Sequence, residues 1–206
     1  LITYETAYLK AHFRTAFLAA NFSCEMGDSD KVKEFLDDCK KSGIEVCPPS
    51  MDKSAWEFEP EGPTTIRFGV GAIKGTGKKA VESMIAARTA ILERVEPFEF
   101  HTLVCECEPA EVGKIAWEAL IKAGAFDFTE VNRGCLFHAL ERALSDGAQA
   151  ASDRRTGQSN LFGTLESGEP DNSPTDLSDE GEWDDHELLD REQEALGHRS
   201  EEHTSE

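Results

Sequence analysis

Four closely spaced glycines that lead directly into a helical pattern constrain this chain more than any other feature. They fall within nine positions, at Gly69, Gly71, Gly75 and Gly77. The residues before them, Thr65–Phe68, have strand character, and the residues after them follow the spacing of an amphipathic helix face: Ala80, Val81, Met84, Ile85 and Arg88. Glycine permits a positive φ and the close approach of another backbone. The segment Gly75-Thr76-Gly77 therefore predicts a tight turn into a helix N-terminus.

Positive charge gathers around this turn. Between Thr64 and Arg94 there are six Lys/Arg against two Glu, although the whole chain of 206 residues has a formal net charge of -20. The first amides of a helix have no intrahelical partner and lie at the positive end of the helix dipole, so they suit a phosphate. A basic island in an acidic protein indicates a polyanionic ligand. The predicted contact residues are Lys74, Gly75, Thr76, Gly77, Lys78 and Lys79.

The glycine turn has alternative interpretations. A short helix, a G-x-G turn and a second helix resemble the helix-hairpin-helix, which binds the DNA backbone without sequence preference. The alternative is a glycine-rich connection packed between a strand and a helix, with its lysines in solvent. A Walker loop is excluded because the G-x-x-x-x-G-K-[ST] pattern is absent. A dinucleotide-binding turn is disfavoured because no second β-α-β strand or ribose-binding acid follows at the usual distance.

The acidic residues concentrate toward the C-terminal end. Residues 163–206 carry 16 Asp/Glu and two Lys/Arg. Because apolar residues are few and Pro170 and Pro174 interrupt the segment, we expect a disordered acidic linker from Gly163 to Asp185. Such a segment repels nucleic acid.

The cysteines and the apolar runs bear on the compartment. The six cysteines contain no C-x-x-C pair, and we expect structural or solvent-facing thiols in a reducing, cytoplasmic compartment: Cys24, Cys39, Cys47, Cys105, Cys107 and Cys135. No apolar run approaches the roughly 18 residues of a membrane span. The sequence starts with Leu rather than Met and has no signal peptide, so we expect it to begin within a longer protein.

Apolar spacing in the first part of the chain predicts helices and short strands. A helix is expected over residues 3–22, with apolar residues on nearly every turn, so that more than one neighbour buries it. A second helix is expected to be capped by Ser29 or Asp30 and to end at Gly43. Short extended segments are expected at 44–47 and on both sides of the turn 59–63.

The later part of the chain predicts more helices. Residues 98–104 fit either a strand or a helix, and a helix is expected over 110–123. Asn132 is expected to cap a long helix. Since the turn 123–131 joins two helices and contains glycine, it is interpreted as a looser second hairpin. The predicted fold class is mainly α with a few short strands.

Three segments resemble a known family. They read TAYLKAHF (Thr6–Phe13), IRFG with AIKG (Ile66–Gly75), and EALIKAGAFD (Glu118–Asp127). In order and spacing they are similar to the bacterial replicative DNA polymerase III alpha subunits, from about Thr3 to Gly197. In that family this region is the end of the fingers domain, followed by a tandem helix-hairpin-helix domain that holds duplex DNA behind the active site.

The resemblance implies a division of the chain into six parts. They are the C-terminal part of the fingers domain (1–62), the tandem helix-hairpin-helix DNA-binding domain (63–155), a clamp-binding motif (156–163), the acidic linker (164–187), a lead-in to an OB-type domain that this sequence lacks (188–198), and a tail that we expect to be non-native (199–206). The tail departs from the family pattern and resembles a translated sequencing adapter.

A short motif follows the long helix. The segment Gln158-Ser159-Asn160-Leu161-Phe162 resembles the Q-x-x-L-F peptide by which such polymerases attach to the ring-shaped sliding clamp. An extended peptide of this kind can hydrogen-bond through the glutamine amide while Leu161 and Phe162 fill an apolar cleft. The alternative is that these two apolar side chains cover the core at the end of the helix.

The sequence departs from the family at two places. Arg14 stands where the family usually has a proline, so we expect the first helix to run on unbroken. The second hairpin of the family begins with a basic run, where this chain has Val112-Gly113-Lys114-Ile115. Its contact with DNA therefore has less positive charge to depend on.

The resemblance implies part of a DNA-directed DNA polymerase that acts in chromosome replication and binds duplex DNA, the sliding clamp and other holoenzyme subunits. Nucleotide addition needs carboxylates that converge on paired Mg²⁺, and in this family they lie in a palm domain outside this sequence. We therefore expect no catalytic or metal-binding residue here, no cofactor, and no activity of this part alone. Two alternatives are a non-catalytic helix-hairpin-helix accessory module tethered to the clamp, and an interaction scaffold that works through its acidic tail.

Overall fold

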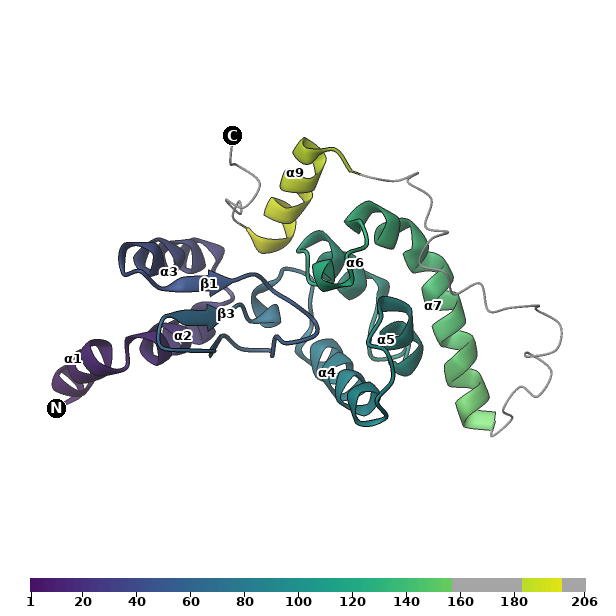
Figure 1. Cartoon of the computed structure of the whole chain (residues 1–206), viewed down its shortest axis with the longest axis horizontal. Helices are drawn as coiled ribbons and strands as arrows, with labels where there is room; N and C mark the ends of the chain where they lie inside the picture. The colour runs from purple at the N-terminus through teal and green to yellow at the C-terminus, as the bar shows by residue number, and fades with distance from the viewer. Residues whose placement is uncertain (157–182, 198–206) are drawn as a thin grey trace.

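The computed structural model describes residues 1–156 and 183–197 and is mainly helical with one small sheet, which confirms the predicted fold class (Figure 1). The elements are α1 (Ile2–His12), α2 (Arg14–Glu25), α3 (Ser29–Lys41), β1 (Glu45–Cys47), β2 (Glu59–Pro60), β3 (Thr65–Arg67), the 3-10 turn η1 (Val70–Ala72), α4 (Lys78–Glu93), α5 (Phe100–Glu106), α6 (Lys114–Lys122), the 3-10 turn η2 (Asp127–Thr129), α7 (Arg133–Thr156) and α9 (Asp185–Leu196).

The sheet combines strands from both sides of residue 62, the predicted boundary between the first two parts of the chain. Its strand order is β1-β3-β2, with β3 parallel to β1 and antiparallel to β2. Ile66, at the centre of β3, is fully buried. On α2, Phe22 stacks on Phe58 at 4.5 Å between ring centroids, and Phe58 lies 4.6 Å from Phe68. Helix α2 therefore packs on the strands that lead into the glycine segment.

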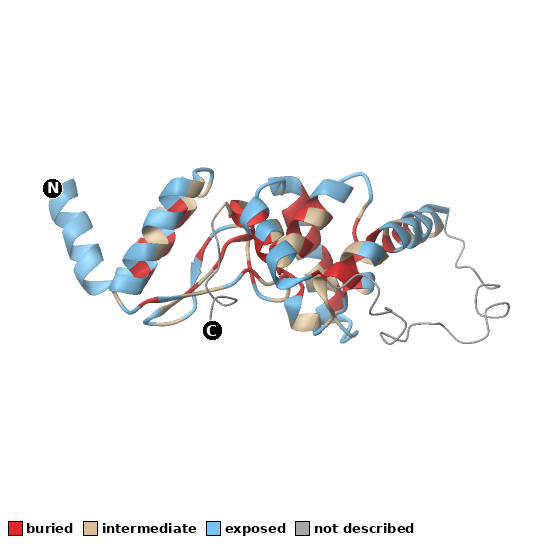
Figure 2. Ribbon diagram, turned by 90° about the horizontal axis from the view of Figure 1, so that it is seen from above, coloured by how far each residue is buried: buried red, intermediate tan, exposed pale blue. Residues whose placement is uncertain are grey.

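The first helix differs from the prediction in two respects. The backbone breaks at Phe13 (φ -132°, ψ 48°), so α1 and α2 are separate helices. No residue of α1 is buried, and Figure 2 shows this helix exposed all round. The expectation of one continuous helix is therefore wrong. The expectation that it is buried is also wrong, because among the described elements only α2 packs closely on α1.

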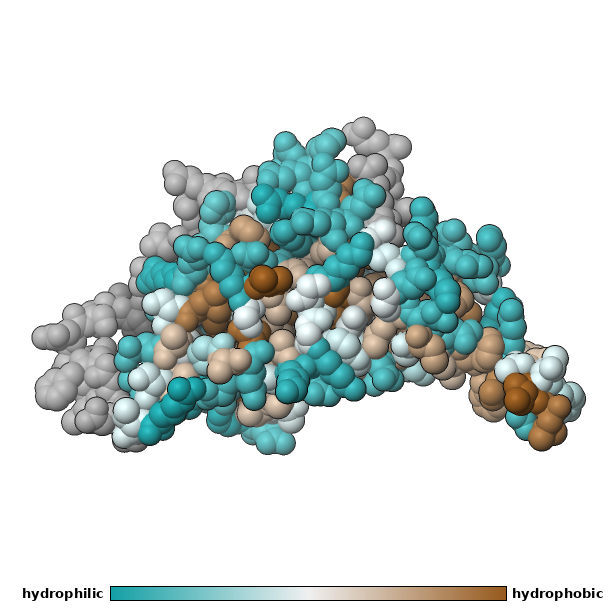
Figure 3. Space-filling model, turned by 180° about the vertical axis from the view of Figure 1, so that it is seen from behind, coloured by the Kyte–Doolittle hydropathy of each residue, from teal (hydrophilic) through white to brown (hydrophobic). Residues whose placement is uncertain are grey.

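Large apolar side chains are exposed on α1 and at the residues that flank it. Leu1 is 96% exposed, Ile2 77%, Tyr4 73% and Phe13 57%. Figure 3 shows this apolar surface gathered at the projecting end of the molecule. Contiguous apolar surface of this kind usually marks a contact with another protein surface.

Several helix boundaries are set by polar caps. The cap of α3 is Asp28 rather than Ser29 or Asp30, because its carboxylate accepts hydrogen bonds from the amides of Asp30 (3.1 Å) and Lys31 (3.3 Å). Gly43 follows α3 with φ +66°, as expected for a glycine at a helix end. Asn132 caps α7, since its side chain accepts a hydrogen bond of 2.7 Å from the amide of Gly134.

Helices α4 to α7 form the second half of the molecule. The ambiguous segment 98–104 contributes to a helix, α5, which packs on α4 and α7. Phe100 of α5 meets Trp117 of α6 edge-on at 5.8 Å and Phe126 at 5.0 Å. Trp117 is 1% exposed, so these rings form the centre of this half. Helix α6 begins at Lys114, later than predicted, because residues 109–112 form a turn closed by the Glu111 amide on the Glu108 carbonyl (2.9 Å).

Hydrogen bonds to main-chain carbonyls join the two halves. The amide of Met51 donates to the carbonyl of Ala125 at 2.7 Å. The guanidinium of Arg88, on α4, donates to the carbonyls of Met51 (2.9 Å) and Ser54 (2.8 Å). Burial lowers the pKa of Arg88 from its usual value. The arginine therefore ties the loop after β1 to the helix that follows the glycine turn.

Across the two described ranges, no helix combines the length and the apolarity that a bilayer crossing requires.

Replacing Gly69 with alanine should destabilise the fold. An added Cβ would lie 2.5 Å from the Glu57 carbonyl carbon and 2.7 Å from the Phe58 amide nitrogen, both of them backbone atoms. Overpacking of this kind costs about 1–3 kcal/mol. Urea denaturation of Gly69→Ala should show a loss in that range. Gly27→Ala is the matched control, since no atom lies within 4 Å of its added Cβ. Equal stability of the two variants would contradict this account.

Candidate nucleic-acid interface

The glycine turn lies between η1 and α4. Gly75 has φ +92°, the left-handed region that the sequence predicted for this turn. The hydroxyl of Thr76 donates to the carbonyls of Ile73 (2.7 Å) and Val70 (3.0 Å). Thr76 is one of the predicted contact residues, and in the structure its hydroxyl is used to close the turn.

The start of α4 presents unpaired amides. Gly77 is its N-cap and no side chain caps the helix. The first helical hydrogen bond runs from the amide of Val81 to the carbonyl of Gly77 (3.1 Å). In the described ranges no hydrogen bond engages the amides of Gly77, Lys78 or Lys79, and all three residues are exposed. These amides lie at the positive end of the helix dipole. This is the geometry that favours an anion at a helix N-terminus.

The four glycines serve two different purposes. An added Cβ would lie 2.5 Å from the Glu57 backbone at Gly69 and 2.7 Å from the Trp56 ring at Gly71. These two glycines are therefore required by close internal packing. At Gly77, by contrast, no atom lies within 4 Å of an added Cβ. The open side of Gly77 leaves room for a foreign group to reach the backbone.

The three arginines of the predicted basic island form hydrogen bonds or ion pairs with other groups of the protein. Arg67 donates to both carboxylate oxygens of Glu61 at 2.8 Å, and this hydrogen bonding lowers the pKa of Glu61. Arg94 pairs with Glu106 at 2.8 Å. Together with Arg88, described above, they hold the fold. The positive charge that remains for a ligand is carried by lysines.

The predicted contact lysines are exposed but not equivalent. Lys78 lies 3.9 Å from Glu82, which is a weak contact at the surface. In the described part of the chain, no carboxylate comes within ion-pair distance of Lys79 or Lys74. Lys74, however, is held through its backbone, because its amide donates to the carbonyl of Ala195 at 2.8 Å.

A second turn of similar form lies beside the first. Gly113 is the N-cap of α6, with no atom within 4 Å of an added Cβ. Ile115, which is 72% exposed, has its Cγ2 atom 3.5 Å from the position of an added Cβ at Gly75. The two helix N-termini therefore lie close together. The basic residue of this second turn is neutralised: Lys114 binds Glu141 at 2.6 Å, and this lowers the pKa of Glu141.

The turn 123–131 does not resemble the first turn, so its interpretation as the second hairpin is wrong. The connection from α5 to α6, which ends at Gly113, has that form instead, at the place where the family resemblance put the start of the second hairpin. Gly124 does have φ +77°, but the guanidinium of Arg133 fills the space beside it. Arg133 donates from Nε to Asp127 at 2.8 Å, so an internal ion pair closes this turn.

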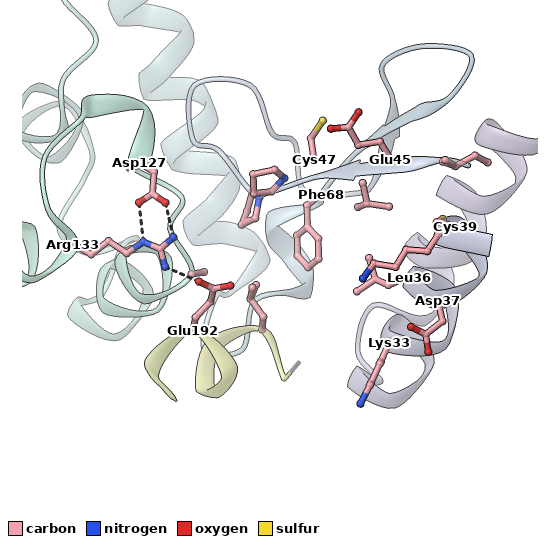
Figure 4. Close-up of a pocket in the computed structure, with 17 residues that line it drawn as sticks. Lys33, Leu36, Asp37, Cys39, Glu45, Cys47, Phe68, Asp127, Arg133 and Glu192 are labelled. Atoms are coloured by element: carbon pink, nitrogen blue, oxygen red, sulfur yellow. Dashed lines mark hydrogen bonds and ion pairs between the residues drawn. The ribbon is translucent and has the colours of Figure 1, made fainter. Parts of the chain in front are cut away.

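Helix α9 is a part of the site that the sequence did not predict. Arg133 donates to Glu192 of α9 at 2.9 Å, and Figure 4 shows this arginine between the carboxylates of Asp127 and Glu192 (Figure 4). Lys122 pairs with Glu194 at 2.9 Å. Glu192 is one acid among many in a strongly acidic region, and nothing in its sequence spacing marks it as the buried one.

A cavity of about 480 Å³ lies between α3 and β1 on one side and α9 on the other. Its walls include Phe68, Cys39 and the Arg133–Glu192 pair. Burial raises the pKa of Cys39 to about 11, so this thiol is protonated at neutral pH. Every buried side-chain nitrogen or oxygen in the described residues has a hydrogen-bond partner.

Two further predictions concern metals and the clamp. In the part of the chain that the structure describes, no three His, Cys, Asp or Glu side chains are grouped to hold a metal ion. Cys107 is buried, and this raises the pKa of its thiol to about 12. The predicted clamp-binding residues, Gln158, Ser159, Asn160, Leu161 and Phe162, lie outside the described residues.

Sequence comparison relates this geometry to known proteins. The helix-hairpin-helix motif family matches residues 43–136, which include both turns. The DNA polymerase III subunit alpha of Neisseria meningitidis serogroup B is 38% identical over 200 residues, which cover 96% of this chain and 16% of that protein. The chain belongs to the DNA polymerase III alpha family.

Other members of this family are similar to the chain over the same share of its length. The DNA polymerase III subunit alpha of Xylella fastidiosa (strain Temecula1) is 34% identical over 197 residues, covering 96% of this chain and 16% of that protein. That of Escherichia coli K12 is 32% identical over 197 residues, covering 96% of this chain and 17% of that protein. The chain thus spans about one sixth of the length of these DNA polymerase III alpha subunits.

Alanine at Gly75 and at Gly77 should affect the fold differently. Gly75→Ala forces a side chain into the left-handed region, which costs roughly 1–2 kcal/mol, while its Cβ would make an ordinary contact with Ala119 at 3.4 Å. Gly77 has φ -93° and an open side, so Gly77→Ala should change the free energy of unfolding by less than about 0.5 kcal/mol. Urea denaturation of both variants tests this difference, and a larger loss for Gly77→Ala would contradict the geometry.

Proposed function

We propose that this chain is the DNA-gripping part of a bacterial replicative polymerase that carries out template-directed DNA synthesis. The observation that supports this most directly is the start of α4, where the amides of Gly77, Lys78 and Lys79 are exposed and unpaired beside two ammonium groups. The match to the helix-hairpin-helix motif over both turns points to the same ligand.

The ligand is the sugar-phosphate backbone of duplex DNA. One phosphate oxygen accepts hydrogen bonds from the α4 amides, while Lys78 and Lys79 neutralise its charge. Contacts of this kind carry no sequence information, because every nucleotide presents the same phosphate. Binding releases counterions from DNA, so the affinity falls as salt rises. The role of this site is to hold DNA of any sequence.

The neighbouring turn contributes less to DNA binding. At Gly113 the backbone is equally open, but the only lysine that begins α6, Lys114, is neutralised by Glu141 and Glu118. The attraction to phosphate therefore rests mainly on the first turn. The exposed Ile115 between the two turns offers an apolar contact to the DNA sugar rings.

Catalysis belongs to other parts of the full-length polymerase. Two-metal nucleotide addition needs clustered carboxylates around Mg²⁺, and we assign these to a palm domain beyond this sequence. The full-length enzyme is then a cytoplasmic nucleotidyltransferase that works with the other holoenzyme subunits. The accessory-module and scaffold alternatives are less favoured, because neither accounts for 38% identity to a polymerase over 96% of the chain.

The exposed apolar face of α1 fits the same proposal. Leu1, Ile2, Tyr4 and Phe13 are exposed, and among the described elements only α2 packs closely on α1. Since the chain matches about one sixth of its relatives' length, we assign this face to a contact with the remainder of the polymerase. Burying Tyr and Phe side chains there contributes roughly 1.5–3 kcal/mol each.

The segment Gln158–Phe162 is proposed to tether the polymerase to the sliding clamp. It follows directly after α7, which ends at Thr156. A short peptide bound in a groove gives modest affinity, but a ring that encircles DNA raises the effective concentration of the polymerase at its substrate. The tether and the hairpin would then hold the same duplex by independent means.

Removing the two lysines of α4 should weaken DNA binding evenly across sequences. We expect the double variant Lys78→Ala, Lys79→Ala to bind any duplex less tightly and to reduce the dependence of log Kd on log salt by about 1–2 units. Fluorescence anisotropy at several salt concentrations measures both quantities.

The matched control is the double variant Lys41→Ala, Lys53→Ala. The Lys53 side chain is 62% exposed and 3.7 Å from Asp52, much as Lys78 is 61% exposed and 3.9 Å from Glu82. Both variants remove the same charge. If they lowered the affinity equally, the effect would be one of net charge and the α4 site would be ruled out.

Removing the anchor side chains of the predicted tether should abolish clamp capture. We expect Gln158→Ala, Leu161→Ala, Phe162→Ala to lower the affinity for the immobilised clamp at least about tenfold, from the loss of two apolar side chains, and to leave duplex affinity unchanged. Gln149→Ala, an exposed glutamine on α7, is the control. Clamp retention equal to that of the unmodified chain would remove this assignment.

A further inference from the structure

Helix α9 is attached to the turn that we propose binds phosphate. The amide of Lys74 donates to the carbonyl of Ala195, in the last turn of α9, at 2.8 Å. Carbonyls in the last turn of a helix lack intrahelical partners, so this bond satisfies both groups. The Lys74 amide belongs to the Ile73–Lys74 peptide, one residue before Gly75. Helix α9 therefore fixes the backbone on the entry side of the left-handed residue.

The Lys74 side chain lies at the same contact. Its ammonium is 3.1 Å from the position that an added Cβ at Gly197 would occupy. Gly197 has φ +76° and directly follows α9. A cation near the C-terminal end of a helix is favoured by the helix dipole. Lys74 thus interacts with α9 through both its backbone and its side chain.

A buried ion pair fixes the position of α9. The side chain of Arg133 is 11% exposed and that of Glu192 is 3% exposed, with 2.9 Å between them. The same guanidinium binds Asp127 and donates to the carbonyl of Lys122 at 3.3 Å. Breaking a buried pair of this kind leaves an uncompensated charge. Glu192 is therefore held by α6, η2 and α7 together.

The N-terminal half of α9 and the residue before its cap are fixed separately. The guanidinium of Arg191 lies over the Trp183 ring at 4.2 Å and over the Phe137 ring of α7 at 5.2 Å. Trp183 and Phe137 also meet at 5.5 Å. The N-terminal end of α9 is thus attached to α7.

The charge of α9 raises the question of whether it competes with DNA. The helix contains five acids and one arginine, and negative charge near a phosphate site is unfavourable. The bond that α9 makes, however, involves the amide of Lys74, whereas the amides of Gly77, Lys78 and Lys79 are not engaged by it. Helix α9 therefore supports the turn without occupying the proposed anion site.

We propose that α9 holds the glycine turn in its phosphate-binding shape, so that Glu192 and Arg133 are positioning residues for DNA binding. The inference rests on the proposed function of the turn. Disturbing Glu192 loosens the Lys74–Ala195 bond, and the left-handed turn then populates other shapes. The DNA affinity falls even though the variant carries one negative charge fewer.

The test compares Glu192→Gln with Asp190→Asn in the full chain. Both variants change an acid of α9 to its amide and alter the net charge equally. Asp190 is 58% exposed and pairs with His186 of the same helix at the surface. Glu194→Gln, which disturbs the exposed pair with Lys122, is a milder second variant if Glu192→Gln does not fold.

Duplex affinity is measured by anisotropy, and backbone protection by hydrogen exchange of the peptides covering 73–77 and 183–197. We expect Glu192→Gln to lower the affinity roughly fivefold and to speed exchange in both peptides, with Glu194→Gln intermediate. Asp190→Asn should keep full protection and equal or slightly tighter binding. Equal behaviour of Glu192→Gln and Asp190→Asn, or tighter binding by Glu192→Gln, would overturn the inference.

Failure of this inference is distinguishable from failure of the proposed function. If Lys78→Ala, Lys79→Ala weakens DNA binding while Glu192→Gln does not, the turn binds DNA without help from α9. If Glu192→Gln speeds exchange but neither variant alters DNA affinity, α9 supports the turn and the turn does not bind DNA. Either result refutes the positioning role.

Discussion

The left-handed backbone at Gly75 is the constraint on which the rest of this structure depends. Three helices meet there: α4 starts just after it, α6 packs against it through Ala119 and Ile115, and α9 bonds to the preceding residue, Lys74. A side chain at this position would have to adopt a backbone conformation that L-residues avoid, and its Cβ would lie against Ala119 of α6 at 3.4 Å. One residue thus links the conformation of the turn to the packing of the helices around it.

Arginines and lysines of the predicted basic island have different roles, because their side chains bind partners differently. Arginine presents several donors in a fixed plane and suits fixed polar partners, whereas lysine is a mobile point charge. Arg67, Arg88 and Arg94 are accordingly bonded to carboxylates or main-chain carbonyls inside the molecule. The lysines of α4 remain at the surface beside unpaired amides. In an acidic chain, this leaves a small region where a phosphate is attracted rather than repelled.

Glycine has two physical roles within nine residues, and they affect function differently. Gly69 and Gly71 let the chain approach the backbone of Glu57 and the ring of Trp56, which places η1 and hence the turn. Gly77 has open space around it, which is what a ligand needs. Substitutions at the first two positions change stability, so any change in DNA binding there would be indirect. A functional experiment should therefore concentrate on Gly77 and the lysines that follow it.

The sequence by itself determined the mainly helical class, the glycine turn and the family, because these depend on local spacing and on motifs read in order. Local spacing also set the caps at Asn132 and Gly43. The resemblance also placed the second hairpin at Val112–Ile115, where the structure has the open turn at Gly113, whereas apolar spacing had pointed to the turn 123–131. Tertiary structure alone decided that the chain breaks at Phe13 and that Glu192 is the buried acid of α9. These features depend on contacts between residues far apart in the chain, which neither periodicity nor composition records. The identity of Arg133 as the partner of Asp127 and Glu192 is of the same kind, since folding alone brings the three side chains together.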